Sequence, residues 1–364
     1  MVEDATQQVT IVAGMGPERA HIFSVLVKRS YAIEDGCPLV ELAAEPFRRT
    51  DAFHEPGDPE TCSVWRESEC APYKVATDIV VLGQAHAPRG QPADRVTVGV
   101  DVGGRQKLLT VTGDRRAIFT DGRTPRFTDP APFTTMPMRY ERAYGGSDRR
   151  SIADKPFHYP RNTVGRGVAL LNLPETIDGL ELPNIEDPDD LLTPERLVIG
   201  EAARWNEQPL AQGLGVFQKT WYPRCSFVGA LPPHVDASTT MREELLGLVP
   251  EGQIALGRGF RLPSFDVRFN TGASIGLALP DVEPGTTIRL ARLSPEPMLG
   301  FTLPMRWPRI GLDIGRGMSE LDTRLHTVTI DIEARRVDMI WRGAQTYPGP
   351  SWLPKMTRLA ADVQ

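Results

Sequence analysis

Two hairpins of alternating apolar residues constrain the fold of this chain more than any other feature of the sequence. In the first, residues 95–102 carry a valine at every second position, which is the period of a strand with one buried face. Gly103 and Gly104 then permit a turn with positive φ, and residues 107–112 form the return strand. The alternating residues are Val96, Val98, Val100 and Val102.

The second hairpin lies near the carboxyl end, with its turn at residues 333–336. Its alternating residues are Val328, Ile330 and Ile332 before the turn, and Val337, Met339 and Trp341 after it. Each hairpin has one apolar face, so each needs an opposing layer. The 33 prolines and 33 glycines in 364 residues would interrupt long helices. The sequence therefore predicts a mainly β fold: a β-sandwich or partly open, barrel-like sheets with long loops and a few short helices.

The remaining elements are short. Near the amino end, residues 9–13 and 22–33 have strand composition and are expected to pair across a turn at residues 14–17. Lys28 and Arg29 near the centre of the second strand favour an edge or a solvent-facing side. Further strands are expected at residues 78–83, 287–293 and 298–303, and helices at 194–205 and 236–248.

The chain is expected to form one β-rich domain over residues 1–364. Residues 180–194 are acidic and bounded by prolines, which suits a surface connection. They mark a candidate boundary between an N-terminal and a C-terminal β half.

Charge and composition exclude several classes of function. The net charge is −6 and the basic residues are scattered, which argues against nucleic-acid binding. The chain has no apolar run long enough for a membrane span and no signal-peptide pattern at its start, so a cytoplasmic location and no membrane partner are expected. Four cysteines in 364 residues do not indicate a disulfide scaffold.

One short motif is typical of an enzyme. Residues 272–276 match G-x-S-x-G, the nucleophile elbow of serine hydrolases, with Ser274 as the nucleophile. Asp313 or Asp322 and then His326 follow in the order of a triad. Pro280 stands four residues after the motif and opposes the helix that an elbow must open, so an ordinary glycine-bearing turn is favoured.

Metal and cofactor sites are weakly indicated. His54, Cys62 and Cys70 are each separated by seven residues, whereas zinc sites usually contain one close pair of ligands, so buried cysteines in a loop are favoured. The acidic cluster lacks the spacing of a calcium loop and is expected to be a solvated turn. It consists of Glu186, Asp187, Asp189 and Asp190. No cofactor is predicted.

The segment at residues 132–146 is polar and aromatic and ends in a Gly-Gly pair. As a strand it would place Arg139 beside Glu141 on one face. Its other face would carry Met138, Tyr140, Arg142 and Tyr144. Such a face serves either as a structural strand or as a protein-contact surface, because tyrosine and arginine are common in both. The structural interpretation is favoured, and it predicts that Tyr140 and Tyr144 are buried.

These segments together resemble a known family. The order of Gly113-Asp114-Arg115, the sequence MPMRYERAYGG at residues 136–146 and residues 162–167 is similar to domain-of-unknown-function family 2169, a bacterial family associated with type VI secretion. Residues 182–186, 221–224, 262–270 and the closing hairpin add to the resemblance. The family-motif residues are Gly113, Asp114, Arg115, Pro137, Arg139, Tyr140, Glu141, Tyr144, Gly145, Gly146, Asn162, Gly165 and Gly167.

The resemblance implies a function without catalysis or cofactor. It implies a cytoplasmic adaptor or chaperone that binds a secreted effector toxin and helps to load it onto the spike protein of the type VI system. A serine hydrolase using Ser274 and a purely structural scaffold are the alternatives.

Overall fold

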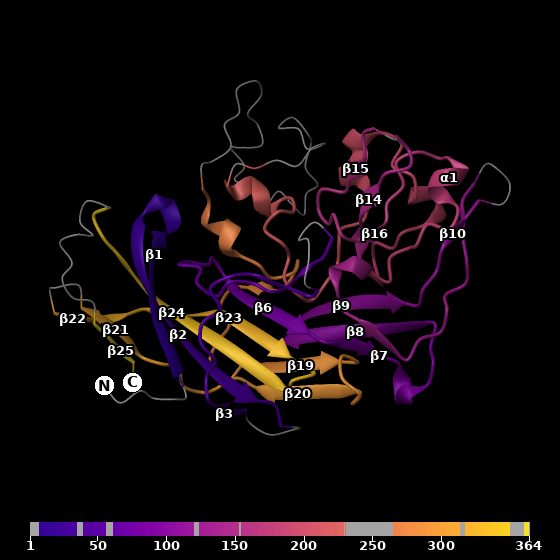
Figure 1. Ribbon diagram of the computed structural model, residues 1–364. Coiled ribbons are helices and arrows are strands. Elements are labelled where there is room, and N and C mark those ends of the chain that lie inside the picture. The colour runs from indigo at the N-terminus through magenta and orange to yellow at the C-terminus, as the bar shows by residue number, and fades with distance from the viewer. Residues whose placement is uncertain are drawn as a thin grey trace.

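The computed structural model describes residues 7–34, 39–55, 61–119, 124–152, 154–228, 230, 265–313, 317–349 and 360–363. Over these residues the protein is mainly β, with several sheets and short helices, and no sheet closes into a barrel (Figure 1). The predicted fold class is therefore confirmed. None of the helices in these ranges has the length and apolar character that a membrane span requires. The predicted helix at residues 236–248 lies outside the described residues.

The larger sheet has seven strands, with the two longest in its interior. The order is β1-β2-β24-β23-β6-β18, and β3 pairs with β2. Neighbouring strands are antiparallel except β23 and β6, which are parallel. The strands are β1 (Gln7–Met15), β2 (His21–Ala32), β3 (Val40–Leu42), β6 (Thr77–Leu82), β18 (Ala278–Leu279), β23 (Thr323–Asp331) and β24 (Arg336–Thr346).

The second sheet has five strands in the order β17-β9-β8-β19-β20, and all of its pairs are antiparallel. Its strands are β8 (Arg95–Val102), β9 (Arg105–Thr112), β17 (Ile185–Glu186), β19 (Thr287–Ala291) and β20 (Met298–Thr302). The β8–β9 hairpin agrees with the prediction, since Gly103 and Gly104 have φ of +59° and +89°. The predicted strands at residues 287–293 and 298–303 are likewise found as β19 and β20.

The two sheets share one apolar core, as expected for a sandwich. The alternating valines of β8 face this core together with Val25 and Val27 of β2 and Trp341 of β24. All of these side chains are buried, because each comes from the inward face of a strand. The predicted closing hairpin is therefore confirmed as β23 and β24, and it supplies the centre of the larger sheet.

The remaining elements are short. The small sheets pair β21 (Ile310–Asp313) with β22 (Met318–Leu321) and β25 (Ala360–Val363), β4 (Ala52–Phe53) with β5 (Val64–Arg66), β7 (Gln84–His86) with β12 (Thr135–Pro137), β10 (Ala117–Ile118) with β11 (Arg126–Phe127), β13 (Tyr144–Gly145) with β16 (Arg166–Gly167), and β14 (Ser147–Asp148) with β15 (Phe157–His158). The helices are α1 (Pro174–Ile177) and the 3-10 turns η1 (Pro17–Arg19), η2 (Pro88–Gly90), η3 (Tyr140–Arg142), η4 (Pro194–Arg196), η5 (Ala202–Glu207), η6 (Arg224–Val228) and η7 (Val267–Asn270).

The outer face of the larger sheet is a buried polar layer. The predicted pairing of β1 with β2 is correct, but the expected edge or solvent-facing side is wrong, because β2 lies between β1 and β24 and Lys28 is only 2% exposed. The chain around β5 covers this face, and the Lys28 ammonium lies 2.8 Å from the Glu69 carboxylate. Arg66 likewise reaches Asp331 and Asp338, at 2.8 and 3.0 Å. Charged side chains are tolerated here because each has a partner.

A second apolar core lies beside the sandwich, in the region of β14, β15, β16 and α1 (Figure 1). It contains the aromatic residues Tyr144, Tyr159, Trp205 and Tyr222. The predicted surface connection at residues 180–194 is exposed at Glu181, Pro188 and Asp189 but not at residues 182–186, where Ile185 and Glu186 form β17 and are buried against β9. The predicted helix at 194–205 is replaced by the separate turns η4 and η5.

Candidate functional site

The central segment of the family motif is a turn rather than a continuous strand. The Ala143 amide donates to the Tyr140 carbonyl at 3.1 Å, which closes η3 between the short strands β12 and β13. The predicted strand and its two faces are therefore wrong over residues 139–143. The prediction that both tyrosines are buried is confirmed, with Tyr140 3% and Tyr144 1% exposed.

Asn162 holds this turn in place. Its Nδ2 donates to the carbonyls of Tyr140 and Tyr144, at 2.8 and 3.1 Å, and the side chain is fully buried. The Gly146 amide returns a bond to the Asn162 carbonyl at 2.8 Å. Gly146 has φ of +99° and its backbone lies against Gly165, so a side chain is excluded there. Residues far apart in the sequence thus form one interlocked unit.

Charged motif residues surround this unit. Arg142 donates to Asp114 at 3.0 Å and to Asn184 at 3.1 Å, while Arg115 pairs with the buried carboxylate of Glu186. Partial burial raises the pKa of Asp114, but the Asn184 amide and the Arg142 guanidinium outweigh it and hold this pKa below its usual value. The carboxyl pKa of Glu186 is raised, because its burial outweighs the Arg115 charge. The expected solvated acidic turn is therefore wrong at Glu186.

Arg139 and Glu141 do not pair with each other, contrary to the strand prediction. The Arg139 guanidinium lies 3.6 Å from Glu55. Glu141 instead accepts from the Ser63 amide at 2.7 Å and from the Ser63 hydroxyl at 2.8 Å. The turn η3 separates the two side chains, and Glu141 ties the motif to the chain that enters β5.

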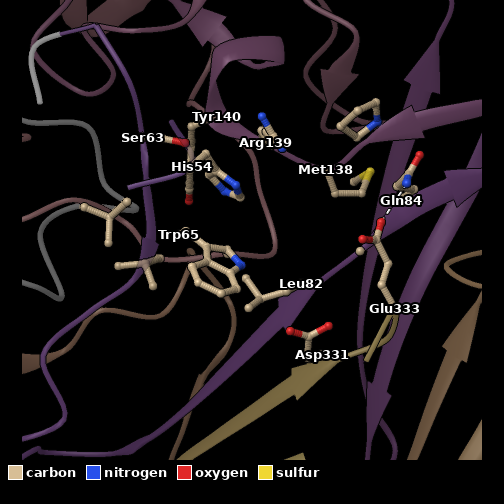
Figure 2. Close-up of a pocket in the computed structure, with 15 residues that line it drawn as sticks. His54, Ser63, Trp65, Leu82, Gln84, Met138, Arg139, Tyr140, Asp331 and Glu333 are labelled. Atoms are coloured by element: carbon tan, nitrogen blue, oxygen red, sulfur yellow. Dashed lines mark hydrogen bonds between the residues drawn. The ribbon is translucent and has the colours of Figure 1, made fainter. Parts of the chain in front are cut away.

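A cavity of about 210 Å³ opens beside the motif (Figure 2). The rings of His54 and Trp65 point into it from one side, and Asp331 and Glu333 stand on the other. Residues 137–140 of the motif form its upper wall. The full set of lining residues is His54, Ser63, Val64, Trp65, Leu82, Gly83, Gln84, Pro137, Met138, Arg139, Tyr140, Gly215, Val216, Asp331 and Glu333. A cavity of this size accommodates one side chain of a partner.

Most polar groups of the cavity are held by neighbours. Gln84 donates to Glu333 at 2.6 Å, and Asp331 is paired with Arg66. Burial, with a smaller contribution from Arg139, lowers the pKa of His54 to about 4, so its ring is neutral at pH 7. The cavity therefore offers aromatic surface, a neutral imidazole and carboxylates, which suit the binding of a partner's side chain.

The geometry of a serine hydrolase is not formed. The Ser274 hydroxyl donates to the Gly215 carbonyl at 2.8 Å and accepts a hydrogen bond from the Tyr140 hydroxyl at 2.7 Å. The His326 ring nitrogens contact the Thr327 hydroxyl at 2.9 Å and the Ala71 carbonyl at 3.1 Å. The strand β18 follows the G-x-S-x-G turn, where an elbow requires a helix. The structure thus favours the glycine-bearing turn.

The three candidate metal ligands are not assembled. Within the described residues there is no group of three histidine, cysteine or acidic side chains suited to a metal ion. The Cys62 sulfur accepts from the Glu55 amide at 3.2 Å, and burial raises the pKa values of the Cys62 and Cys70 thiols. Both are free thiols, and of the two Cys62 is buried while Cys70 is half-buried.

Several cavity residues escaped the sequence analysis. They come from three separate segments that share no motif: Trp65 lies in β5, Gln84 in β7, and Asp331 and Glu333 at the β23–β24 turn. The sequence therefore contains no local signal that joins them. The chain at residues 45–72, which is long and irregular, is the one indication that an unusual surface lies there.

Fold and site together define a β-sandwich protein with an interlocked motif and a side-chain-sized cavity. The chain belongs to the family described as uncharacterized protein conserved in bacteria (DUF2169), whose model matches residues 18–342. Searches of the curated proteins and of the solved structures returned no significant match.

Proposed function

We propose that this protein is a non-catalytic adaptor or chaperone that binds a secreted effector toxin and helps to load it onto a type VI spike protein. The resemblance of the motif segments to a secretion-associated family gives the system and the partners. The observation that carries the proposal is the cavity in Figure 2, which brings Arg139, Trp65 and Met138 together beside the motif.

The lining of the cavity suits an anchor residue of a protein partner. Tryptophan, tyrosine and arginine dominate interface hot spots, and Trp65, Tyr140 and Arg139 line this cavity. The Arg139 side chain is 39% exposed, and its ion pair with Glu55 is long and exposed to solvent. Such a pair is worth little, so Arg139 is free to change partner at small cost.

Exposed methionines supply further contact surface. Met298, Met305 and Met318 are 53%, 75% and 52% exposed. Methionine is flexible and polarizable, and it is common on surfaces that bind several partners. An adaptor that must bind and later release its cargo benefits from such adaptable contacts.

The test is co-purification of the tagged protein with the effector encoded beside it and with the spike protein. Arg139→Glu is expected to abolish effector capture while leaving the protein folded. Arg309→Glu is the matched control, because Arg309 is an exposed arginine paired with Glu320 away from the cavity. Capture of neither partner by the wild-type protein would contradict the adaptor and leave the structural scaffold. Equal loss in both variants would refute the role of the cavity alone.

A further inference from the structure

A second cleft, of about 480 Å³, lies between the chain that enters β6, the loop that leaves β18 and the β23–β24 pair. The polar residues at its mouth are Asp281, Glu283, Asp322 and Arg324, and Val282 and Leu325 are buried apolar side chains of its wall. Its size is typical of a site for a small molecule or a peptide end. It shares no lining residue with the cavity at the motif.

Arg342 is the unusual residue of this cleft. It lines the cleft and is 8% exposed; burial lowers the pKa of its guanidinium, Tyr73 and Asp322 oppose this, and no carboxylate of the described residues forms an ion pair with it. Its guanidinium carbon lies 3.8 Å from the centre of the Tyr73 ring, and its Nη1 is buried without a hydrogen-bond partner. Buried charges in proteins are normally paired, so an arginine in this state indicates an absent anionic partner.

A second unpartnered donor lines the same cleft. Trp307 is partly buried against the sandwich core, and its Nε1 is also buried without an acceptor. An indole N–H can only donate, so an acceptor supplied by a bound molecule would satisfy it. Two buried donors without acceptors in one cleft are a combination that an oxyanion would satisfy.

The buried cations of the cleft are Arg342 and Lys74, of which Lys74 is paired with Asp78, and the exposed mouth carries three carboxylates and Arg324. Arg324 lies directly opposite Arg342 on the neighbouring strand and pairs with the exposed Asp322 at 2.9 Å. Burial and the charges of Lys74 and Arg342 keep the pKa of the adjacent His326 well below its usual value. The acidic residues at the mouth would repel a doubly charged phosphate more than a singly charged carboxylate.

We propose that this cleft binds a carboxylate group, with Arg342 and Trp307 as the donors to its oxygens. A guanidinium presents two parallel N–H groups that match the two carboxylate oxygens, and the apolar wall and the aromatic rings accommodate the carbon skeleton. The carboxylate belongs either to a free organic acid or to the carboxyl terminus of a peptide. This site is independent of the adaptor function proposed above.

Calorimetric titration of the full chain with benzoate, and with benzamide as its neutral counterpart, tests the proposal. Saturable binding of benzoate and none of benzamide is expected. Arg342→Gln is expected to weaken benzoate binding by at least about tenfold, since the paired donors are lost. Arg204→Gln, an exposed arginine paired with Glu207 on η5, is the control and is expected to bind as the wild type does.

Trp307→Phe keeps an aromatic ring and removes the N–H, so it gives a second test if Arg342→Gln does not fold. It is expected to weaken benzoate binding by about tenfold to a hundredfold, the effect of one hydrogen bond to an ion. The tripeptide Ala-Ala-Phe and its carboxyl-terminal amide separate the two sources: tighter binding of the free tripeptide than of benzoate indicates a peptide end. Equal affinity for benzoate and benzamide, or unchanged binding in both variants, would refute the site.

Discussion

Replacing Asn162 tests whether the family motif is a structural lock. The side chain is fully buried and its Nδ2 donates to the carbonyls of Tyr140 and Tyr144. Asn162→Ala removes both bonds at a cost of about 2–4 kcal/mol. The Tyr140 carbonyl keeps its bond from Ala143, and the variant also removes the Asn162 Oδ1, which is buried without a partner. The retained bond and the removal of an unsatisfied oxygen together reduce this cost by roughly 1 kcal/mol. The free energy of unfolding is therefore expected to fall by about 1–3 kcal/mol.

Asn162→Asp separates hydrogen bonding from packing. Aspartate has nearly the shape of asparagine but replaces the donating amide by an oxygen that faces two carbonyls. At pH 7 it would bury an unpaired charge, so it is expected to lower the free energy of unfolding by about 3 kcal/mol or more, beyond the effect of alanine.

Urea unfolding, followed by tryptophan fluorescence and circular dichroism, measures both variants. Stability is taken from the midpoint and the slope, and a common slope shows that the same surface unfolds. If Asn162→Asp proves more stable than Asn162→Ala at pH 7, packing rather than donation holds the turn, and the reasoning is refuted. A change below about 0.5 kcal/mol in Asn162→Ala would refute it equally.

Three further predictions follow from the same region. Tyr140→Phe is expected to lower the free energy of unfolding in urea by about 1 kcal/mol, because its hydroxyl forms a hydrogen bond with Ser274 at 2.7 Å. Ser274→Ala is expected to destabilise the Tyr140→Phe variant less than it destabilises the wild type. Gly146→Ala is expected to be insoluble or destabilised by more than about 2 kcal/mol in thermal unfolding, since φ is +99° and Gly165 fills the space, and a wild-type melting curve would contradict this. The pKa of His54 falls from 6.5 to about 4 on folding, so the unfolded chain binds more protons between these values and stability decreases as pH falls through that window. Denaturant titrations at pH 7 and pH 4.5 are expected to differ less for His54→Gln than for wild type, and an unchanged difference would contradict the assignment.

The regular part of the fold could be predicted because its signal is local. The valines of β8 and the alternating residues of β23 and β24 indicate which face of each strand is buried. The short turns of the β8–β9 and β23–β24 hairpins set the strand pairing. Residues 139–143 could not be placed, because the side chain that turns them is Asn162, about twenty positions away. The predicted exposure of Lys28 was wrong for a related reason, because the carboxylate that permits its burial belongs to Glu69, which is distant in the sequence.

The candidate site was predicted only in part. Its motif wall, at residues 137–140, could be identified as a segment, but the facing residues come from elements that meet through the sheet topology. The parallel pairing of β23 with β6 brings Asp331 beside Leu82. Sequence periodicity gives the orientation of a side chain within one strand and does not say which strands become neighbours.

The polar layer on the outer face of the larger sheet has a consequence for the uniqueness of the fold. The chain from Ser63 to Tyr73 has no regular pattern of apolar residues that could fix its position. On an apolar surface it could therefore pack in several registers. Lys28 and Asp338 on the sheet instead require Glu69 and Arg66 at two separate points. A shift of this chain by one residue would leave buried charges without partners, so the layer selects one placement of the covering chain at little gain in stability.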